Sequence, residues 1–375
     1  MPELKRRKIA LVHDWLTGMR GGEKVLEVLC EIFPAADIFT LVHLRGRVSG
    51  VIERHKIVTS PLQAIPGIGR YYRNMLPLMP WAVEHFDLSA YDVVISSSHC
   101  VAKGAKPREG APHWCYCHTP MRYIWDQFDD YFGPTQASSA VRFAMNAFRP
   151  RLQQWDVEST SRVDTFIANS ENVRGRIQRI YQRDARVIYP PVDFDFYSRR
   201  METLPARREP FYLVVSALAP YKKIDMAIEA FSKMGKKLVI VGEGQDSAKL
   251  KALGNASIEF LGWRSDEDLR SCYQRAQALI FPGEEDFGIV PLEAMASGCP
   301  VIAFAKGGAL ETVIENKTGL FFSGQSVNDL SSAVGRFEQR TFDPALIQAH
   351  AERFSRRHCE EQFRRAFVEY QNEMS

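Results

Sequence analysis

Residues 284–298 read EEDFGIVPLEAMASG and place two glutamates, Glu285 and Glu293, eight positions apart. Pro291 suits the first turn of a helix, where its missing N–H costs little, and Gly298 suits the residue just past the helix end. Glu285 is therefore predicted in the loop before the helix and Glu293 inside it, with residues 299–303 as the next strand. Because helix starts attract anions and carboxylates accept hydrogen bonds from hydroxyls, the stretch predicts a ligand that carries both groups, such as a nucleotide sugar.

Length and composition predict a two-domain globular protein. The chain has 375 residues, of which 45% are hydrophobic and 25% charged, and its formal net charge is +3. So small a positive charge predicts no nucleic-acid partner. The seven cysteines are scattered, and the charged start lacks the apolar core of a signal peptide, so we expect reduced thiols and a cytoplasmic protein. No apolar run approaches the roughly 18–20 residues that span a membrane.

Short apolar runs alternate with helical stretches along the chain. The first half predicts strands at 8–13, 37–42, 56–59, 91–96, 113–117 and 165–169, and a helix at 23–33. After a proline-rich break at 189–195 the pattern restarts with strands at 211–218, 237–241, 257–261, 278–281 and 301–304, and with helices at 224–234 and from Asp266, which Ser265 can cap.

Strands that alternate with helices predict an α/β fold of two Rossmann-like domains facing a central cleft, with one large sheet as the alternative. The predicted domains are residues 1–195 and 205–355. We expect the final helix, within 356–375, to pack back on the first domain.

Glycines and lysines supply candidate phosphate contacts. Gly21 and Gly22 end the loop after the first strand, where glycine lets backbone approach an anion, although an ordinary tight turn explains the pair equally well. Lys222 and Lys223 follow the first strand of the second domain, where open α/β sheets bind ligands. The alternative for this pair is a solvated surface position. The dinucleotide fingerprint is incomplete, so an NAD-dependent oxidoreductase is less favoured.

Two strings have the composition of metal sites without fitting one. The run HWCYCH at 113–118 lies in a predicted strand, whose alternate side chains face opposite ways, whereas zinc needs several on one side. Residues 193–195 have the Asp-x-Asp spacing of metal-dependent sugar transferases but lie in the proline-rich break. We therefore expect no metal site in either string.

With these residues in place, the chain resembles a known family. Residues 285–301 are similar to the paired-glutamate signature of retaining glycosyltransferases of the GT-B fold, glycosyltransferase family 4. The likeness extends over nearly the whole chain and also involves residues 13–14, 21–25, 116–123, 169–170, 219–225, 307–311 and 318–320. It is nearest to the bacterial mannosyltransferases of O-antigen, lipopolysaccharide and exopolysaccharide assembly.

The resemblance implies roles for the two glutamates and the lysines. Lys222 would hold the donor diphosphate, Glu293 the ribose hydroxyls and Glu285 the hydroxyls of the transferred sugar. The family has an arginine five residues before this lysine, where the chain has Ala217. Lys223 or Arg264 would have to replace it.

The resemblance also implies contacts from other segments. His118 would lie near the donor sugar across the cleft, and the alternative is a buried structural histidine. Further donor contacts would come from the amides of Phe287 and Gly288, from Gly22 beside the diphosphate or acceptor, and from the backbone near Trp263 at the base. Glu311 is interpreted as a helix-start residue rather than a catalytic one.

The implied activity is retaining transfer of a hexose, above all mannose from GDP-mannose, onto a lipid-linked saccharide or another glycan. A lysine and a helix start can stabilise the leaving phosphate, so we expect no metal and no other cofactor. Family likeness favours attack on the same face of the sugar over Glu285 as a covalent nucleophile. The alternatives are a sugar-nucleotide epimerase of the same fold and a non-catalytic nucleotide-sugar-binding protein.

Residues 66–81, PGIGRYYRNMLPLMPW, combine basic, aromatic and apolar side chains. Such a segment can lie on anionic lipid, which would suit a lipid-linked acceptor at the inner face of the membrane. Ordinary packing within the first domain is the equal alternative.

Overall fold

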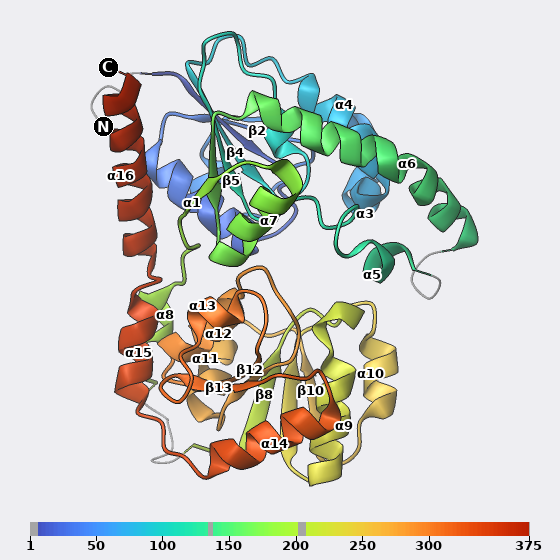
Figure 1. The fold of residues 1–375 in the computed structure, drawn as a ribbon, viewed down its shortest axis with the longest axis vertical. Coiled ribbons are helices and arrows are strands. Elements are labelled where there is room, and N and C mark those ends of the chain that lie inside the picture. The colour runs from blue at the N-terminus through green and yellow to red at the C-terminus, as the bar shows by residue number, and fades with distance from the viewer. Residues whose placement is uncertain (1–6, 134–137, 202–207, 375) are drawn as a thin grey trace. The chain divides into compact units, whose positions relative to one another are not determined.

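The structure, a computed structural model, describes residues 7–133, 138–201 and 208–374. The chain divides into two units, residues 1–190 with 359–375 and residues 191–358. Each unit holds a sheet with helices against it (Figure 1). The division after Pro190 lies inside the proline-rich break. The predicted start of the second domain, residue 205, lies outside the described residues.

The first unit is built on a seven-stranded sheet in the order β3-β2-β1-β4-β5-β6-β7, with every pairing parallel. Its strands are β1 (Ile9–His13), β2 (Asp37–Thr40), β3 (Ile57–Thr59), β4 (Val93–Ser98), β5 (His113–Cys117), β6 (Thr165–Ala168) and β7 (Ala185–Val187). Alternate residues of β1 enter two different core clusters, one with Ala10 and Val12 and the other with Ile9 and Leu11. Helices therefore cover both faces, as a parallel sheet requires.

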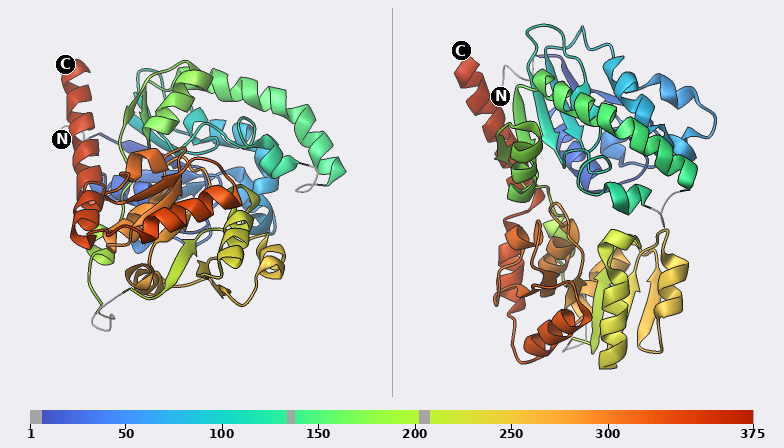
Figure 2. Two further views of the ribbon diagram at one scale, coloured as in Figure 1. Left: turned by 60° about the horizontal axis from the view of Figure 1, so that its bottom comes forward. Right: turned by 45° about the vertical axis from the view of Figure 1, so that its right-hand side comes forward.

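The connections of the first unit are mostly helical, and their arrangement can be followed in Figures 1 and 2. They are α1 (Gly21–Ile32), α2 (Gly50–Glu53), η2 (Pro61–Ala64), α3 (Ile68–Tyr71), η3 (Tyr72–Leu78), α4 (Met79–Glu84), η4 (Ala102–Gly104), α5 (Phe128–Phe132), α6 (Ser139–Glu158), η5 (Ser159–Arg162) and α7 (Glu171–Tyr181). None of the helices in the described ranges is long and apolar enough to cross a membrane.

Three details of the first unit differ from the sequence-based prediction. Gly21 and Gly22 form the first turn of α1 rather than the preceding loop, because the Glu23 side chain accepts a hydrogen bond from the Arg20 amide and so starts the helix early. Strand β4 runs on to Ser98, since Ser97 and Ser98 still pair with β5. Strand β7, of three residues with the charged Arg186 at its centre, was not predicted, because it offers no continuous apolar run.

The second unit has a six-stranded parallel sheet in the order β10-β9-β8-β11-β12-β13. Its strands are β8 (Phe211–Val215), β9 (Lys237–Val241), β10 (Ile258–Gly262), β11 (Leu279–Phe281), β12 (Val301–Phe304) and β13 (Gly319–Phe322). Strand β8 ends three residues before the predicted Leu218, which instead bonds to the loop after β9 through Glu243 O. The four residues of β13 were not predicted as a strand.

Several helices of the second unit begin at a side chain that caps them. They are α8 (Phe194–Tyr197), η6 (Pro220–Lys222), α9 (Ile224–Met234), α10 (Ser247–Leu253), α11 (Asp266–Arg275), α12 (Ile289–Ala296), α13 (Ala309–Thr312), α14 (Val327–Glu338) and α15 (Pro344–Glu352). Ser265 caps α11 as predicted, with its hydroxyl accepting from the Asp268 amide. Asp193, from the Asp-x-Asp string, caps α8 in the same way through the Phe196 amide.

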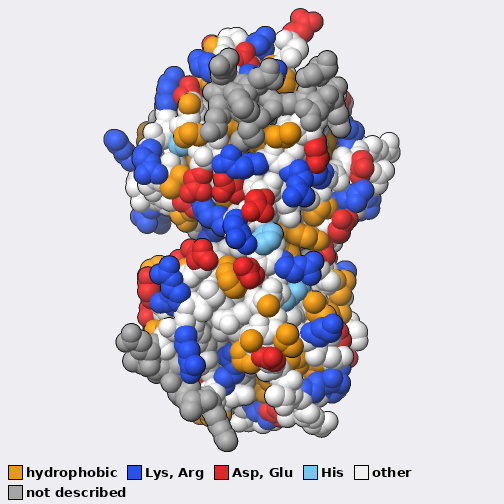
Figure 3. Space-filling view, turned by 90° about the vertical axis from the view of Figure 1, so that its left-hand side faces the viewer, with side chains coloured by type: hydrophobic (Ala, Val, Ile, Leu, Met, Phe, Trp, Pro, Cys, Tyr) orange, Lys and Arg blue, Asp and Glu red, His pale blue; other side chains and the backbone are white. Residues whose placement is uncertain are grey.

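The last helix, α16 (Arg356–Met374), returns from the second unit to the first. Its apolar side enters the core beside β5: Phe363 is fully buried, and the ring of Phe367 stacks on Trp114 with centroids 4.5 Å apart. Trp114 thus packs against a helix that lies more than 240 positions later in the chain. Side chains of both charges intermingle in the view of Figure 3, which accords with the small net charge.

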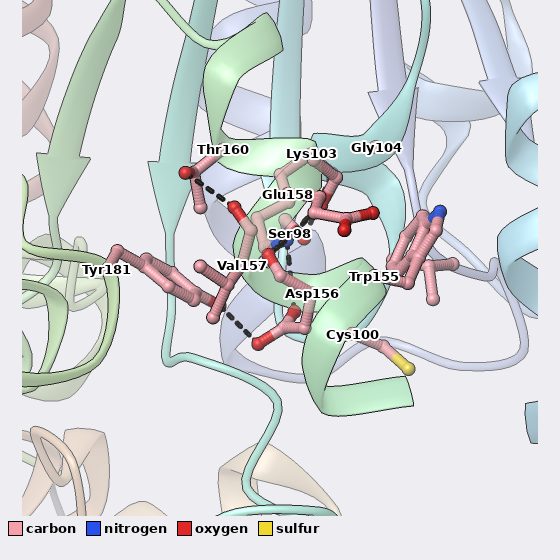
Figure 4. A network of polar contacts seen from close by, with 12 residues as sticks. Ser98, Cys100, Lys103, Gly104, Trp155, Asp156, Val157, Glu158, Thr160 and Tyr181 are labelled. Carbon is pink, nitrogen blue, oxygen red and sulfur yellow. Dashed lines mark hydrogen bonds and ion pairs between the residues drawn. The ribbon is translucent and has the colours of Figure 1, made fainter. Parts of the chain in front are cut away.

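A buried ion pair fixes the end of α6 to η4, the turn that follows β4 in the first unit (Figure 4). Lys103 Nζ lies 3.0 Å from Asp156 Oδ1 and 2.6 Å from Ser159 Oγ, and both charged side chains are almost fully buried. The carboxylate of Asp156 also accepts hydrogen bonds from Trp125 Nε1 and from the hydroxyl of Tyr181. Such a pair is costly to bury, and its donors and acceptors specify one arrangement of α6 and α7.

Candidate active site

The site in the second unit lies where the strand order reverses. Strand β8 has β9 on one side and β11 on the other, so the chain leaves β8 in one direction and later returns to its opposite edge. The carboxyl ends of strands at such a switch point form the crevice in which open α/β sheets bind ligands. Lys222 follows β8 in η6, and Glu285 lies in the loop after β11. The topology therefore brings together two residues that are 63 positions apart.

Lys222 and Glu285 contact each other directly, Nζ to Oε1. Their side chains are 14% and 24% exposed, so the pair is mostly shielded while one edge stays open to a ligand. The ammonium also lies 5.0 Å from the ring centroid of Tyr221. The sequence-based interpretation assigned the lysine to a phosphate and the glutamate to a sugar. It did not predict that the two side chains would pair. A phosphate that binds Lys222 must therefore share it with Glu285.

Glycines allow three loops to meet at this point. A Cβ on Gly283 would lie 3.0 Å from the Lys222 Cα, and one on Gly308 would lie 2.2 Å from the Phe287 Cα. The Gly308 amide donates to the Glu285 carbonyl at 2.9 Å. The loop after β12 is thus packed on the loop after β11, and any side chain at Gly308 would force the two apart.

Helix α12 follows this loop and carries the second glutamate. Gly288 caps it in the left-handed conformation with φ 87°, and Pro291 lies in its first turn. Glu293 is buried, and its Oε2 accepts a hydrogen bond from the Tyr273 hydroxyl at 3.1 Å. Burial and then the charge of Glu293 raise the pKa of Tyr273 well above its ordinary value, so the phenol keeps its proton and orients the carboxylate.

The predicted position of Glu285 in the loop and that of Glu293 in the helix are both confirmed. Gly298 follows the end of α12 with φ 73°, and its amide donates to the Met295 carbonyl at 2.8 Å. Phe287 is buried and packs on Phe354 with ring centroids 6.0 Å apart. The start of α12 is thus held by core contacts rather than by its sequence alone.

A third part of the second unit lies at the carboxyl ends of β9 and β10. Trp263 follows β10 and is 71% exposed, an unusual exposure for the largest side chain. Its amide donates to Glu243 Oε1 at 3.4 Å, and Arg264 Nη1 donates to its carbonyl at 3.0 Å. Lys223 is exposed and caps α9 with φ 54°. Ala217 is also exposed, and replacement of its missing charge by Lys223 or Arg264 stays a prediction.

The first unit has a switch point of its own, between β1 and β4. Asp14 follows β1 and is fully buried. Its carboxylate accepts four backbone hydrogen bonds of 2.7–3.0 Å from residues 99–102, after β4. His99 Nδ1 lies 3.1 Å from the same carboxylate. Asp14 thus ties the two strand ends together, which makes its role structural.

Two histidines of the first unit, His13 and His118, are joined by one serine. Ser97 Oγ is 3.1 Å from His13 Nδ1 and 2.9 Å from His118 Nε2. Burial, and then the nearby His99 and His13, lower the pKa of His118 well below its ordinary value, so its imidazole is neutral. A Cβ on Gly22 would lie 3.6 Å from His118 Nε2. Gly22 is therefore at this site, although in α1 rather than in a loop.

The run HWCYCH alternates its side chains as predicted. His113 is buried, with Nε2 2.8 Å from Ser96 Oγ and Nδ1 2.9 Å from the Arg162 carbonyl. Cys115 and Cys117, on the same face of β5 as His113, enter the apolar cluster with Phe166, whereas Trp114 and Tyr116 enter the cluster on the opposite face. Within residues 7–133, 138–201 and 208–374, three or more His, Cys, Asp or Glu side chains nowhere gather as they would to hold a metal.

Sequence reasoning missed Ser97, His99 and Tyr273. The run SSSH at 96–99 ends a buried strand, and polar side chains at a strand end are a signal that could have been used. Tyr273 gave no such signal, since its partner is on another helix. Residues of each unit come together locally: Lys222, Glu285, Phe287 and Gly288 in the second, and His118 with Gly22 in the first.

The amino-acid sequence matches two family models. Residues 19–196 match the model described as Glycosyltransferase Family 4, and residues 198–355 match the one described as Glycosyl transferases group 1. Nearly the whole chain is accounted for by the two together.

Curated relatives match over part of their length. An uncharacterized glycosyltransferase of Methanocaldococcus jannaschii is 29% identical over 181 residues, 47% of this chain and 50% of that protein. A GDP-mannose-dependent alpha-mannosyltransferase of Mycobacterium tuberculosis is 33% identical over 143 residues, 38% of this chain and 35% of that protein. The chain thus spans half the length of these relatives or less.

Solved structures match over the full length. Anabaena Alr3699/HepE in complex with UDP and glucose superimposes with a TM-score of 0.70 at 17% identity, over 96% of this chain and 99% of that chain. At this level of identity the likeness shows a shared fold.

Proposed function

Because this chain belongs to the family 4 glycosyltransferases of the GT-B fold, we propose that it transfers a hexose from a nucleotide sugar to a glycan acceptor with retention of configuration. The observation that carries the proposal is the contact of Lys222 with Glu285 at the switch point, with Glu293 on the helix that follows. A cation for a diphosphate and two carboxylates for hydroxyls match the groups of a nucleotide sugar.

The charges of the site suit the chemistry of sugar transfer. As the bond to the anomeric carbon breaks, negative charge grows on the leaving diphosphate and positive charge on the sugar. Lys222 and the start of α12 would stabilise the former, and the carboxylate of Glu285 the latter. Lys222 can serve both Glu285 and a phosphate because an ammonium has three donors. We propose that this arrangement needs no metal ion, so a chelator should leave the rate unchanged.

Glu293 and Trp263 would hold the nucleoside. The carboxylate of Glu293 is oriented by Tyr273 and would accept hydrogen bonds from ribose hydroxyls. The exposed ring of Trp263 offers a flat surface at a strand end, and the backbone beside it would contact the base. In the first unit, neutral His118 would contact a hydroxyl of the transferred sugar.

We propose GDP-mannose as the donor. Support comes from the relative that is named a GDP-mannose-dependent alpha-mannosyltransferase. The structural match to a complex with UDP and glucose makes a uridine donor the competing outcome. A lipid-linked saccharide is proposed as the acceptor, in the assembly of a bacterial polysaccharide or lipopolysaccharide.

A thermal-shift panel of GDP-, UDP- and ADP-sugars tests the donor before any acceptor is known. The proposal expects stabilisation by GDP-mannose and its loss in Glu293→Gln, while Lys233→Met, an exposed change on α9, keeps it. Stabilisation by none of the three would refute a nucleotide-sugar site. If the bound sugar nucleotide is converted without an acceptor, the protein is an epimerase. Binding without transfer to any glycan extract would indicate a non-catalytic protein.

A lipid-linked acceptor would be reached at a membrane surface, and two segments of the first unit suit anionic lipid. In the first, residues 66–81, Ile68 and Leu76 belong to the core, as the packing alternative predicted. Tyr71, Leu78 and Trp81 are nevertheless 48%, 49% and 49% exposed. The packing interpretation therefore holds for the buried side chains, and lipid binding by the exposed ones stays a proposal.

Helix α6 is the second segment, and it was not predicted from the sequence to bind lipid. Phe143 is 78% exposed, Val141 48% and Phe148 41%. The charged residues of its first 17 positions are three arginines, without an acidic residue. Figure 2 shows the helix extending along the outside of the first unit. Apolar side chains flanked by arginines alone are complementary to an anionic bilayer rather than to a neutral one.

Vesicle co-sedimentation separates lipid binding from packing. We expect the protein to bind vesicles containing phosphatidylglycerol and not pure phosphatidylcholine. The change Phe143→Ser should weaken binding, as should charge reversal at Arg70 and Arg73. Val368→Ser, on the exposed side of α16, is the matched control and should not. Equal binding by all variants, or equal binding to both lipids, would sink this proposal.

A further inference from the structure

Four side chains of the first unit form a row that ends at His118. Glu23 comes from α1, His13 from the end of β1, Ser97 from β4 and His118 from the residue after β5. Glu23 Oε1 lies 3.8 Å from His13 Nε2, a nitrogen with no hydrogen-bond partner within the described part of the chain. Ser97 Oγ then joins His13 Nδ1 to His118 Nε2, at 3.1 and 2.9 Å.

The hydrogens of this row can point in either of two directions. A serine hydroxyl has one hydrogen, and a neutral imidazole has one N–H and one bare nitrogen. Ser97 therefore donates to one histidine and accepts from the other. If it donates to His13, then His118 carries its hydrogen on Nε2 and leaves Nδ1 bare. If it donates to His118, the hydrogen of His118 lies on Nδ1 instead.

Glu23 favours the first direction. Its side chain is 4% exposed and that of His13 is fully buried, so water screens the carboxylate only weakly. The negative charge attracts a hydrogen to His13 Nε2, and this leaves Nδ1 as the acceptor for Ser97. Burial acts to raise the pKa of Glu23, but the adjacent His13 side chain, with smaller effects of His99 and of a backbone hydrogen bond, outweighs it and lowers the pKa. The carboxylate is therefore ionised at neutral pH.

We propose that Glu23, His13 and Ser97 are positioning residues that hold His118 as its Nε2–H tautomer and present a bare Nδ1 to a sugar hydroxyl. The inference rests on the proposed function, which places a sugar at His118. A bare nitrogen accepts a hydrogen bond from the O–H of a hydroxyl, whereas an N–H would donate to its oxygen. The charge of Glu23, two side chains away, thus decides the direction of the hydrogen bond between His118 and the sugar hydroxyl.

Nitrogen NMR of the full chain with ¹⁵N-labelled histidine reads the tautomer directly. In the wild type, His118 is expected to be protonated at Nε2 alone. In Glu23→Gln the bias is removed, because an amide can turn either its oxygen or its nitrogen toward His13, and the Nδ1–H form of His118 should become populated. Glu31→Gln, an exposed change on the same helix, should leave the spectrum unchanged. An Nδ1–H tautomer in the wild type, or an unchanged His118 in Glu23→Gln, would overturn the proposal.

Ser97→Ala provides a second variant with little risk to folding, since it removes only the bridging oxygen. His118 Nε2–H should lose its acceptor and exchange with water faster, and kcat/KM should fall about five- to tenfold, as for one lost hydrogen bond. Unchanged exchange of this hydrogen would also overturn the proposal. If the tautomer of His118 changes as expected but sugar transfer by the variants is unaffected, the positioning role of Glu23, His13 and Ser97 is confirmed. The proposed contact of His118 with the sugar is then wrong.

Discussion

The sharpest prediction concerns Lys222→Met, which keeps the aliphatic length of the side chain and removes its charge. The lysine is proposed to bind the donor diphosphate while paired with Glu285. A hydrogen bond to a charged group contributes about 1.5–3 kcal/mol, so the dissociation constant of the nucleoside diphosphate should rise roughly 10- to 150-fold. The dissociation constant should rise by more than the roughly tenfold lower limit of this range, because Glu285 loses its partner and then repels the incoming anion.

Calorimetric titration with the nucleoside diphosphate, monophosphate and nucleoside tests this directly. Weakening should be greatest for the diphosphate and small for the nucleoside. Lys233→Met, which breaks an exposed pair with Glu229 on α9, serves as the control and should change none of the three constants. Lys222→Met with unchanged diphosphate affinity would refute the phosphate role.

A double-mutant cycle separates phosphate binding from charge pairing. Adding Glu285→Gln to Lys222→Met removes the unpaired carboxylate and should restore part of the lost affinity. If Lys222 only neutralised Glu285, the double variant would bind as well as the wild type. Partial recovery is the result that the proposed site requires.

Three further predictions follow from buried polar groups. Glu293→Gln should weaken nucleoside binding about tenfold in the same titration, with a smaller effect on turnover of bound donor; the reverse pattern would contradict the ribose role. Lys103→Met should lower the free energy of unfolding of the first unit by roughly 3–5 kcal/mol in urea titrations, because Asp156 is left buried and unpaired, and a loss below 1 kcal/mol would contradict this. Burial lowers the pKa of His113 to about 4 from 6.5. Between these two values the unfolded chain binds more protons than the folded one. The free energy of unfolding should therefore fall as the pH drops from 6.5 to 4, by at most about 3 kcal/mol. Tryptophan fluorescence of a Trp263→Phe background follows the first unit in both titrations, since Trp263 is the second unit's sole tryptophan, and a flat pH profile would contradict the burial effect.

Local pattern was enough for much of the fold. Strand β5 was predicted at its observed bounds, and helix α9 also matches, because apolar period, caps and glycine exits act within a few residues. Errors came where local signals compete or are too short. The Glu23 side chain moved the start of α1 forward, and β7 and β13 have only three and four residues.

Local sequence was enough to place Glu285 in a loop and Glu293 in the following helix, because Pro291 and Gly298 fix where that helix begins and ends. The contacts of these carboxylates depend instead on how distant segments pack. Lys222 reaches Glu285 because β8 and β11 are neighbours, and Ser97 joins His13 to His118 because β4 lies between β1 and β5. Strand order depends on how the whole sheet buries its apolar faces, and no stretch of residues encodes it locally. The residues that contact the two glutamates, and so set their chemical roles, thus come from other segments of the chain.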